Sequence, residues 1–161
     1  MAAHPVNKVV THDKNGTIIK GTTIDFLAKR RVFHLMKNHL QGGEVQKIDV
    51  ERLKGVFFVK DFQGNKEYQE VKKFRDQPVS AKKVKAIFAD GEVIYGYTHA
   101  INHDLPGFFL VPADPKSNNE RIFAVFSSIV RLEVDGRNIQ LRRRQVPQLD
   151  LTAYERRREQ T

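Results

Sequence analysis

Several residue types and sequence patterns are missing from this chain, and each absence excludes a class of protein. The 161 residues include no cysteine, so disulfide frameworks, thiolate zinc sites, iron–sulfur clusters and cysteine nucleophiles are excluded. No apolar run approaches the roughly 20 residues that a membrane-spanning helix requires. The opening residues, MAAHP, have neither the basic nor the apolar segment of a secretory signal. We therefore expect a cytoplasmic protein without a membrane partner.

Motifs of catalysis and cofactor binding are missing as well. The sequence contains neither the Gly-x-Gly-x-x-Gly nor the Gly-Lys-Ser/Thr pattern of phosphate-binding loops. His99, His103 and Asp104 could be combined as metal ligands, but their spacing on a strand that runs into a loop has no helical meaning. No acid–base pair or nucleophile can be assembled either. The sequence predicts no metal, no cofactor and no enzymatic activity.

Positive charge is what the chain has in excess. Lys and Arg number 28 against 19 Asp and Glu, which gives a net charge of +9. The arginines concentrate after Gly136, and guanidinium groups bind phosphate better than lysine does. These arginines are Arg137, Arg142, Arg143, Arg144, Arg156, Arg157 and Arg158. This distribution favours a polyanion partner, although a merely solvated basic tail fits the pattern equally well.

A second basic stretch, from Lys66 to Lys85, is interleaved with Tyr68 and Phe74. Aromatic rings between cations can stack on nucleic-acid bases. Anchoring a linker on a core is the more common use of such rings, and it is the interpretation we favour.

An internal repeat is the most informative pattern in the sequence. The stretch Asn15–Gly21 matches Asp90–Gly96, at an offset of 75 residues. Each stretch begins with Asn-Gly or Asp-Gly, the dipeptides typical of hairpin turns in which both central residues have positive φ. Phe33–Met36 matches Phe108–Val111 at the same offset. A third match, between segments at 50–56 and 126–132, needs one inserted residue.

The repeat predicts an all-β fold, a tandem duplication of two five-stranded small barrels of the Sm/SH3 type. We expect a first barrel at 1–62, a linker at 63–81, a second barrel at 82–135 and a basic tail at 136–161. The expected strands are 8–13, 17–26, 31–36, 45–50 and 54–60 in the first copy, and 82–89, 92–101, 107–112, 120–126 and 128–134 in the second. In the tail, Thr152 and Glu155 have the spacing of a capping box, which permits a short helix over 151–159.

Two segments are apolar on both faces, unlike ordinary half-exposed strands. They are Val56–Val59 and Phe108–Val111. Such a strand must be covered on both sides, so we expect Phe57 and Phe58 to be buried, one ring inside its own barrel and one against a neighbour. The simplest neighbour is the other barrel. A second copy of the chain would serve too, so the oligomeric state stays open.

The polar segment from Asp114 to Arg121 is the candidate binding loop. Asn and Asp support tight turns through side-chain hydrogen bonds, so a rigid connector in which Arg121 pairs with Asp114 explains the composition. The functional alternative makes Asn118, Asn119 and Arg121 readers of a base or a phosphate, because small barrels commonly bind single-stranded nucleic acid through loops.

Two stretches of the sequence resemble a bacterial domain family of unknown function. The first is Leu53–Asn65, and the second is Asp90–Phe123 with its motif Gly-Phe-Phe-Leu-Val-Pro-Ala-Asp-Pro-Lys-Ser-Asn-Asn-Glu-Arg. That resemblance implies no activity. The strand plan also resembles the Sm and Hfq proteins, which are RNA chaperones. It is less similar to PilZ domains, which bind cyclic dinucleotides, because their Arg-x-x-x-Arg and Asp/Asn-x-Ser-x-x-Gly motifs are absent.

We conclude that the sequence favours a non-enzymatic binding protein whose partner is RNA or another nucleic acid. The candidate contacts are the three loop residues named above and the arginines at 142–144 and 156–158. The alternatives are a protein-interaction or signalling adaptor that binds an acidic protein, and more distantly a cyclic-dinucleotide receptor. Salt dependence separates the first two, because phosphate binding weakens steeply with salt and apolar docking does not.

Overall fold

Eleven antiparallel strands make up almost all of the regular structure in the computed structural model, which describes residues 6–37, 43–76, 80–141 and 155–157. The strands are β1 (Asn7–Asp13), β2 (Ile18–Thr23), β3 (Val32–Met36), β4 (Val45–Asp49), β5 (Leu53–Val59), β6 (Lys82–Phe88), β7 (Val93–Thr98), β8 (Gly107–Pro112), β9 (Asn119–Val125), β10 (Ile129–Val134) and β11 (Arg137–Ile139). The predicted all-β class is confirmed. No helix within the described ranges has the length and apolar character needed to cross a membrane.

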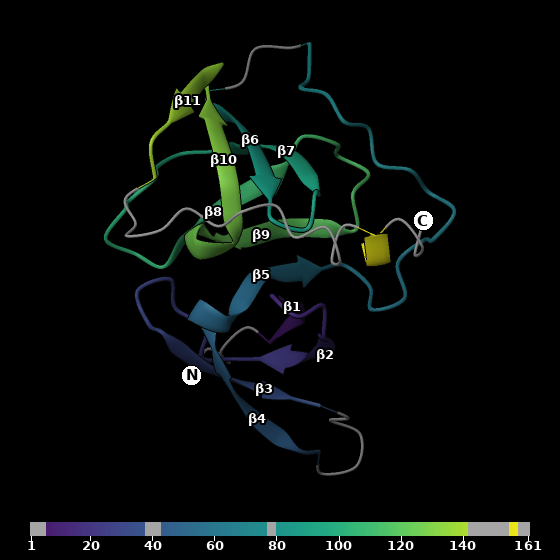
Figure 1. Ribbon diagram of the computed structural model, residues 1–161. Helices are drawn as coiled ribbons and strands as arrows, with labels where there is room; N and C mark the ends of the chain where they lie inside the picture. The colour runs from purple at the N-terminus through teal and green to yellow at the C-terminus, as the bar shows by residue number, and fades with distance from the viewer. Residues whose placement is uncertain (1–5, 38–42, 77–79, 142–154, 158–161) are drawn as a thin grey trace.

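All strands belong to one sheet, in the order β11-β10-β6-β7-β8-β9-β5-β1-β2-β3-β4. This order repeats one connectivity, since β5-β1-β2-β3-β4 corresponds strand by strand to β10-β6-β7-β8-β9. In each half a single 3-10 turn precedes the fifth strand, at Val50–Arg52 and at Phe126–Ser128. The halves join where β5 pairs with β9, and Figure 1 shows these two strands side by side at the middle of the molecule.

The first hairpin of each half has the same turn. The N–H of Gly16 donates to the carbonyl of Asp13, and the N–H of Gly91 donates to the carbonyl of Phe88. Both glycines have φ of +89°, the left-handed conformation that glycine adopts without a steric penalty. Asn15 and Asp90 do not have positive φ. The turn is therefore a three-residue loop that ends on a left-handed glycine, not the two-residue turn that the dipeptides suggested.

The second strand of each half contains a glycine that the third strand presses against. A Cβ on Gly21 would lie 2.5 Å from the carbonyl oxygen of Met36, and a Cβ on Gly96 would lie 2.6 Å from that of Val111. The pairs Gly21–Met36 and Gly96–Val111 are related by the same 75-residue offset. The close approach of the third strand therefore requires glycine at both positions.

Both second strands are shorter than predicted, because β2 ends at Thr23 and β7 at Thr98. The Thr23 hydroxyl donates to the Asp25 carboxylate, and the Thr98 hydroxyl shares its one proton between the carbonyls of Ala100 and Phe109. Local side-chain bonds of this kind turn a chain out of its ladder.

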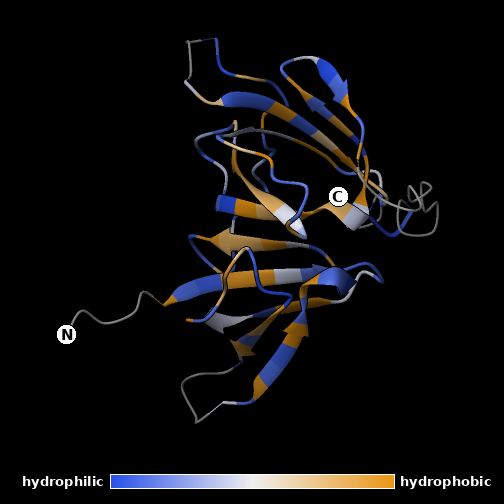
Figure 2. Cartoon of the chain, turned by 90° about the vertical axis from the view of Figure 1, so that its left-hand side faces the viewer, coloured by the Kyte–Doolittle hydropathy of each residue, from blue (hydrophilic) through white to orange (hydrophobic). Residues whose placement is uncertain are grey.

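Strand β5 is buried along its whole length and contributes to two cores. Phe57 packs in a core formed mainly by the second half, and Phe58 packs in a core formed mainly by the first half. The exchange is reciprocal, because Phe123 of β9 lies in the core of the first half. The prediction that both rings are buried is confirmed, with exposed fractions of 6% and 2%. Figure 2 shows apolar residues along the strands at the middle of the molecule, where the halves meet.

The start of the basic tail forms a strand that the sequence analysis did not predict. Asp135 and Gly136 both have positive φ, 50° and 80°, so this Asp-Gly pair makes the two-residue hairpin that joins β10 to β11. Leu141 then packs against the second-half core. Further along, residues 155–157 are helical, and the rest of the predicted helix over 151–159 lies outside the described residues.

The segment between the halves is held to the outer surface of β7 and β8. The Tyr68 hydroxyl donates to the Asp114 carboxylate, which also accepts from the backbone N–H groups of Val71 and Lys116. Phe74 packs against Tyr95 and Tyr97. Tyr68 and Phe74 therefore anchor this segment to the second half, in line with the favoured interpretation.

Replacing Gly21 or Gly96 with alanine should lower the free energy of unfolding by about 1–3 kcal/mol, because the added Cβ meets a strand backbone. Urea denaturation would measure the loss. Gly136, where a Cβ meets nothing within 4 Å, is the matched control. Asparagine tolerates positive φ, so Gly136→Asn should cost less than Gly136→Ala. At Gly21 and Gly96 the asparagine variant should lose more stability than the alanine variant, because the larger side chain clashes more with the third strand. An identical order at all three sites would contradict the argument.

Candidate functional site

Arg121 is the sequence-predicted residue whose surroundings suggest ligand binding. Its guanidinium lies over two aromatic rings, 4.2 Å from the ring centre of Phe58 and 4.7 Å from that of Phe109. Among the described residues, no side chain forms an ion pair or a hydrogen bond with it. The expected pairing with Asp114 is not formed. Stacking on two rings fixes the plane of the guanidinium while its N–H donors stay available.

A pocket of about 330 Å³ lies beside Arg121. Its floor is apolar, and the half-buried ring of Phe109 and the side chain of Val111 contribute to it. His99 and Asn102 stand at its exposed rim. Arg121 is the only Lys, Arg, Asp or Glu among the described lining residues. One fixed cation over an apolar floor suits a ligand that combines an anionic group with a flat apolar one.

The strand pattern explains why a pocket forms here. Cross-strand partners share a face of a sheet, so the pairs Phe58–Arg121, Phe109–Phe123 and Tyr97–Val111 place one continuous face across β5, β9, β8 and β7. The first-half core covers one end of this face, and the segment containing Phe74 covers the other. The part between the two covers is the pocket floor.

The other two loop residues have different surroundings. The Asn118 side chain clamps the chain after β5, because its Nδ2 donates to the carbonyl of Asp61 and its Oδ1 accepts from the N–H of Asp61. Both the N–H donor and the oxygen acceptor of its side-chain amide are therefore used in hydrogen bonds within the fold. Asn119 begins β9 and is half-buried, and its backbone N–H donates to the Ser117 hydroxyl. The three residues that the sequence grouped together thus have different roles: Asn118 clamps the chain after β5, Asn119 begins β9, and Arg121 is a half-buried cation stacked on two rings.

Two of the tail arginines contact the folded body. The Arg156 guanidinium donates to the carbonyl of Asn15 at 2.6 Å and lies against Gly16. Arg157 forms an ion pair with Glu92 at 2.7 Å. These contacts fall on the first hairpin turn of each half, so residues 155–157 bridge the two halves. Arg142, Arg143, Arg144 and Arg158 lie outside the described residues.

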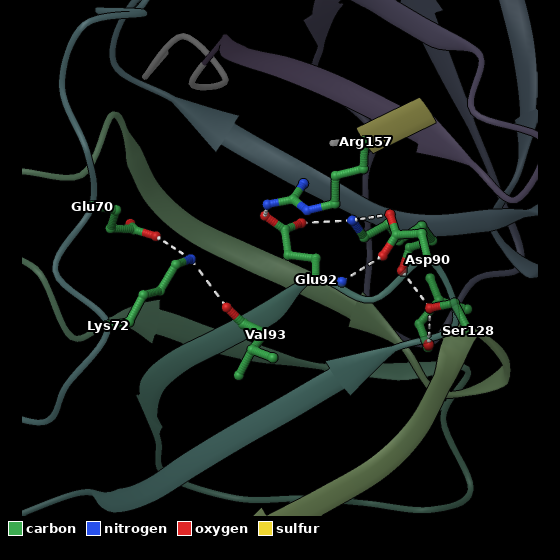
Figure 3. A network of polar contacts seen from close by, with 9 residues as sticks. Glu70, Lys72, Asp90, Glu92, Val93, Ser128 and Arg157 are labelled. Carbon is green, nitrogen blue, oxygen red and sulfur yellow. Dashed lines mark hydrogen bonds and ion pairs between the residues drawn. The ribbon is translucent and has the colours of Figure 1, made fainter. Parts of the chain in front are cut away.

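A buried ion cluster, which the sequence analysis missed, lies beside these turns. Lys54 is 5% exposed, and its Nζ is 2.6 Å from both the Asp90 and the Glu92 carboxylates. The second carboxylate oxygen of Glu92 holds Arg157, as Figure 3 shows. Burial alone would raise the pKa of Glu92, but the attraction of Lys54 and Arg157 outweighs it and lowers the pKa to about 2. The available signal was a lysine within the apolar segment 53–59, which requires a carboxylate partner once buried.

His12 lies next to this cluster and packs on the Phe57 ring, with 4.6 Å between ring centres. Burial and the positive charge of Lys54 lower its pKa to about 4. The neutral imidazole is therefore the form present in the folded protein near neutral pH. Its surroundings give it a packing role within the junction.

The Asp114 carboxylate, 6% exposed, accepts hydrogen bonds from the linker residues Tyr68 and Val71 and from Lys116. Burial would raise its pKa, but the three hydrogen bonds that it accepts from Tyr68, Val71 and Lys116 lower it. The hydrogen bond between Tyr68 and Asp114 raises the pKa of the Tyr68 hydroxyl to about 12. Asp114 therefore holds the linker in place and is not available to a ligand. Within the described ranges, no group of three or more His, Asp or Glu side chains could hold a metal ion.

Most of the chain matches one known protein family. The model of a family described as "Family of unknown function (DUF6982)" matches residues 6–136. The chain belongs to this family. The expectation of a domain family of unknown function is thereby confirmed. No curated protein and no solved structure matches the chain.

Acid should destabilise the fold in two adjoining pH ranges. His12 has a lower pKa when folded, so the unfolded chain binds the extra proton first, and stability falls as pH drops from about 6.5 to 4. Glu92 also has a lowered pKa, so its contribution is present above about 4.5 and is lost as pH approaches 2. By linkage the Glu92 contribution amounts to about 3 kcal/mol.

Urea denaturation at a series of pH values would test this. The His12→Gln variant should lose the pH dependence of the upper range, and Glu92→Gln should reduce that of the lower range, to which Asp114 with its lowered pKa also contributes. Unchanged slopes in both variants would show that other groups cause the acid sensitivity.

Proposed function

We propose that the chain is a non-enzymatic cytoplasmic binding protein for nucleic acid, with RNA as the first candidate. The observation that carries the proposal is the Arg121 guanidinium, held over Phe58 and Phe109 without an ion-pair partner in the described part of the chain. Arginine stacked on aromatic rings is a common feature of nucleic-acid sites, where it contacts a phosphate or stacks on a base. The net charge of +9 adds long-range attraction for such a ligand.

We also propose that the two halves are duplicated small barrels of the Sm/SH3 type, side by side in one sheet. Three repeated features support this: the strand order, the glycine that faces the third strand, and the 3-10 turn before the fifth strand. Small barrels often bind nucleic acid on a face or loop that their core leaves open. The face that carries Arg121 is of this kind.

The tail arginines divide into two groups in this proposal. Arg156 and Arg157 are already bound to Asn15 and Glu92, so they attach the tail to the body. Arg142, Arg143, Arg144 and Arg158 are proposed as phosphate contacts that position the ligand without reading its sequence.

Arg121→Gln should weaken the binding of RNA by roughly three- to tenfold and reduce the slope of log affinity against log salt by about 0.7–0.9. Fluorescence anisotropy at two salt concentrations would measure both effects. The matched control is Arg131→Gln, which removes the same charge from an arginine that is bonded to Glu133. If the two substitutions had equal effects, general electrostatic attraction between the protein and RNA would explain the binding. A specific site at Arg121 would then be refuted.

Removing residues 142–161 should weaken binding by a similar factor for all sequences and flatten its salt dependence. The cut should follow Leu141, because β11 and Leu141 belong to the folded body. A second variant with glutamine at positions 142, 143 and 144 keeps the contacts of Arg156 and Arg157. It should reproduce most of the loss. If the intact chain binds neither RNA nor DNA in a salt-sensitive way, the nucleic-acid proposal is wrong and an acidic protein partner becomes the better candidate.

A further inference from the structure

The pocket beside Arg121 has the size and chemistry of a site for one small flat group. Its volume of about 330 Å³ lies at the lower end of the range for ligand pockets. Val111, on its floor, is 48% exposed although it is a large apolar side chain. An exposed apolar residue inside a concave site, unlike one on a convex surface, can be covered by a ligand without any rearrangement.

The pocket opens where β7 and β8 separate. Their ladder pairs Gly96 with Pro112 and Tyr97 with Val111, and the chain then leaves the sheet until Gly107. The Thr98 hydroxyl donates across this gap to the carbonyl of Phe109 at 2.7 Å. That bond ties the end of β7 to β8 at a fixed distance, and the Phe109 ring, 5.0 Å from the Phe123 ring centre, forms part of the floor.

Polar side chains are few among the described residues that line the pocket. His99 and Asn102 are exposed at the rim. The Asn102 Oδ1 already accepts from the N–H of Asp104, whereas its Nδ2 donates to no group within the described residues and can serve a ligand. A nucleobase fits this distribution, because its faces are apolar and its edges carry donors and acceptors.

We propose that this pocket takes one unstacked base of a single-stranded nucleic acid while Arg121 binds the adjoining phosphate. This inference rests on the proposed nucleic-acid function and specifies its ligand. A base within a duplex is stacked on both sides and cannot enter a concave pocket unless it is extruded. The chain should therefore prefer single strands to duplexes, whereas the tail arginines alone would bind both.

The test compares oligouridine and oligoadenosine of about six nucleotides with a duplex of the same length, in anisotropy titrations at two salt concentrations. Wild type should prefer the single strands by roughly tenfold, a factor within the range for one stacked base. Val111→Glu should remove this preference. The control Val71→Glu adds the same charge at a valine of similar exposure, 45%, that lies outside the pocket lining. It should leave the preference intact.

The outcomes separate the two proposals. Salt-sensitive binding without a single-strand preference, or with a preference that Val111→Glu leaves intact, would overturn the pocket inference and keep the general function. Absence of salt-sensitive binding would overturn both. Inorganic phosphate as a competitor provides a further check. If it displaces the oligonucleotide completely at millimolar concentration, the site holds phosphate alone and the base assignment is wrong.

Discussion

The pairing of β5 with β9 is the contact on which the rest of this structure depends. It makes β5 a strand with neighbours at both edges and apolar cover on both faces. Phe57 and Phe58 are adjacent in the chain, so they point to opposite faces and enter different cores. Truncating a buried phenylalanine typically costs about 3–5 kcal/mol. At this strand the cost would fall on the second-half core for Phe57 and on the first-half core for Phe58.

The same pairing creates the candidate site. Because β9 continues the sheet of β5, the face that buries Phe58 extends onto Arg121, Phe109 and Val111. The core of the first half covers one end of this face, and the linker covers the other end. The pocket is therefore a property of the joined halves, since Ala28 of the first half and Arg121 of the second both line it. The buried Lys54 lies at the same junction and balances its charge against Asp90 and Glu92.

Local signals in the sequence predicted the local structure well. The positions of the Asn15-Gly16 and Asp90-Gly91 turns and the double-sided apolar run at Phe57 and Phe58 all depend on near neighbours in the chain. The Asp135-Gly136 turn had the same signal and was overlooked, because it lies where the composition indicated a tail.

Contacts between distant residues were not predictable from the sequence. The Arg121 stack requires the register of β5 against β9, which joins residues 63 positions apart at the Phe58–Arg121 pair. The Lys54 cluster requires partners 36 and 38 residues away. No periodicity or dipeptide signal carries that information, because register is set by the packing of the whole sheet. The role of a polar side chain such as Asn118 is equally hard to predict from the sequence. An asparagine that bonds to the backbone of its own chain and one that contacts a nucleic-acid base are the same residue type.

The exchange of aromatic residues between the two cores has a consequence for how the molecule loses its structure. A half that separated from its neighbour would leave Phe57 or Phe123 in water and open a void where the ring had been. Neither half then has a low-energy folded state of its own. The 63-residue separation across the β5–β9 pair also places this junction among the contacts with the highest loop-closure entropy. We therefore expect a single cooperative unfolding transition in which tryptic cleavage of the linker, before any denaturant is added, lowers the midpoint of both halves together.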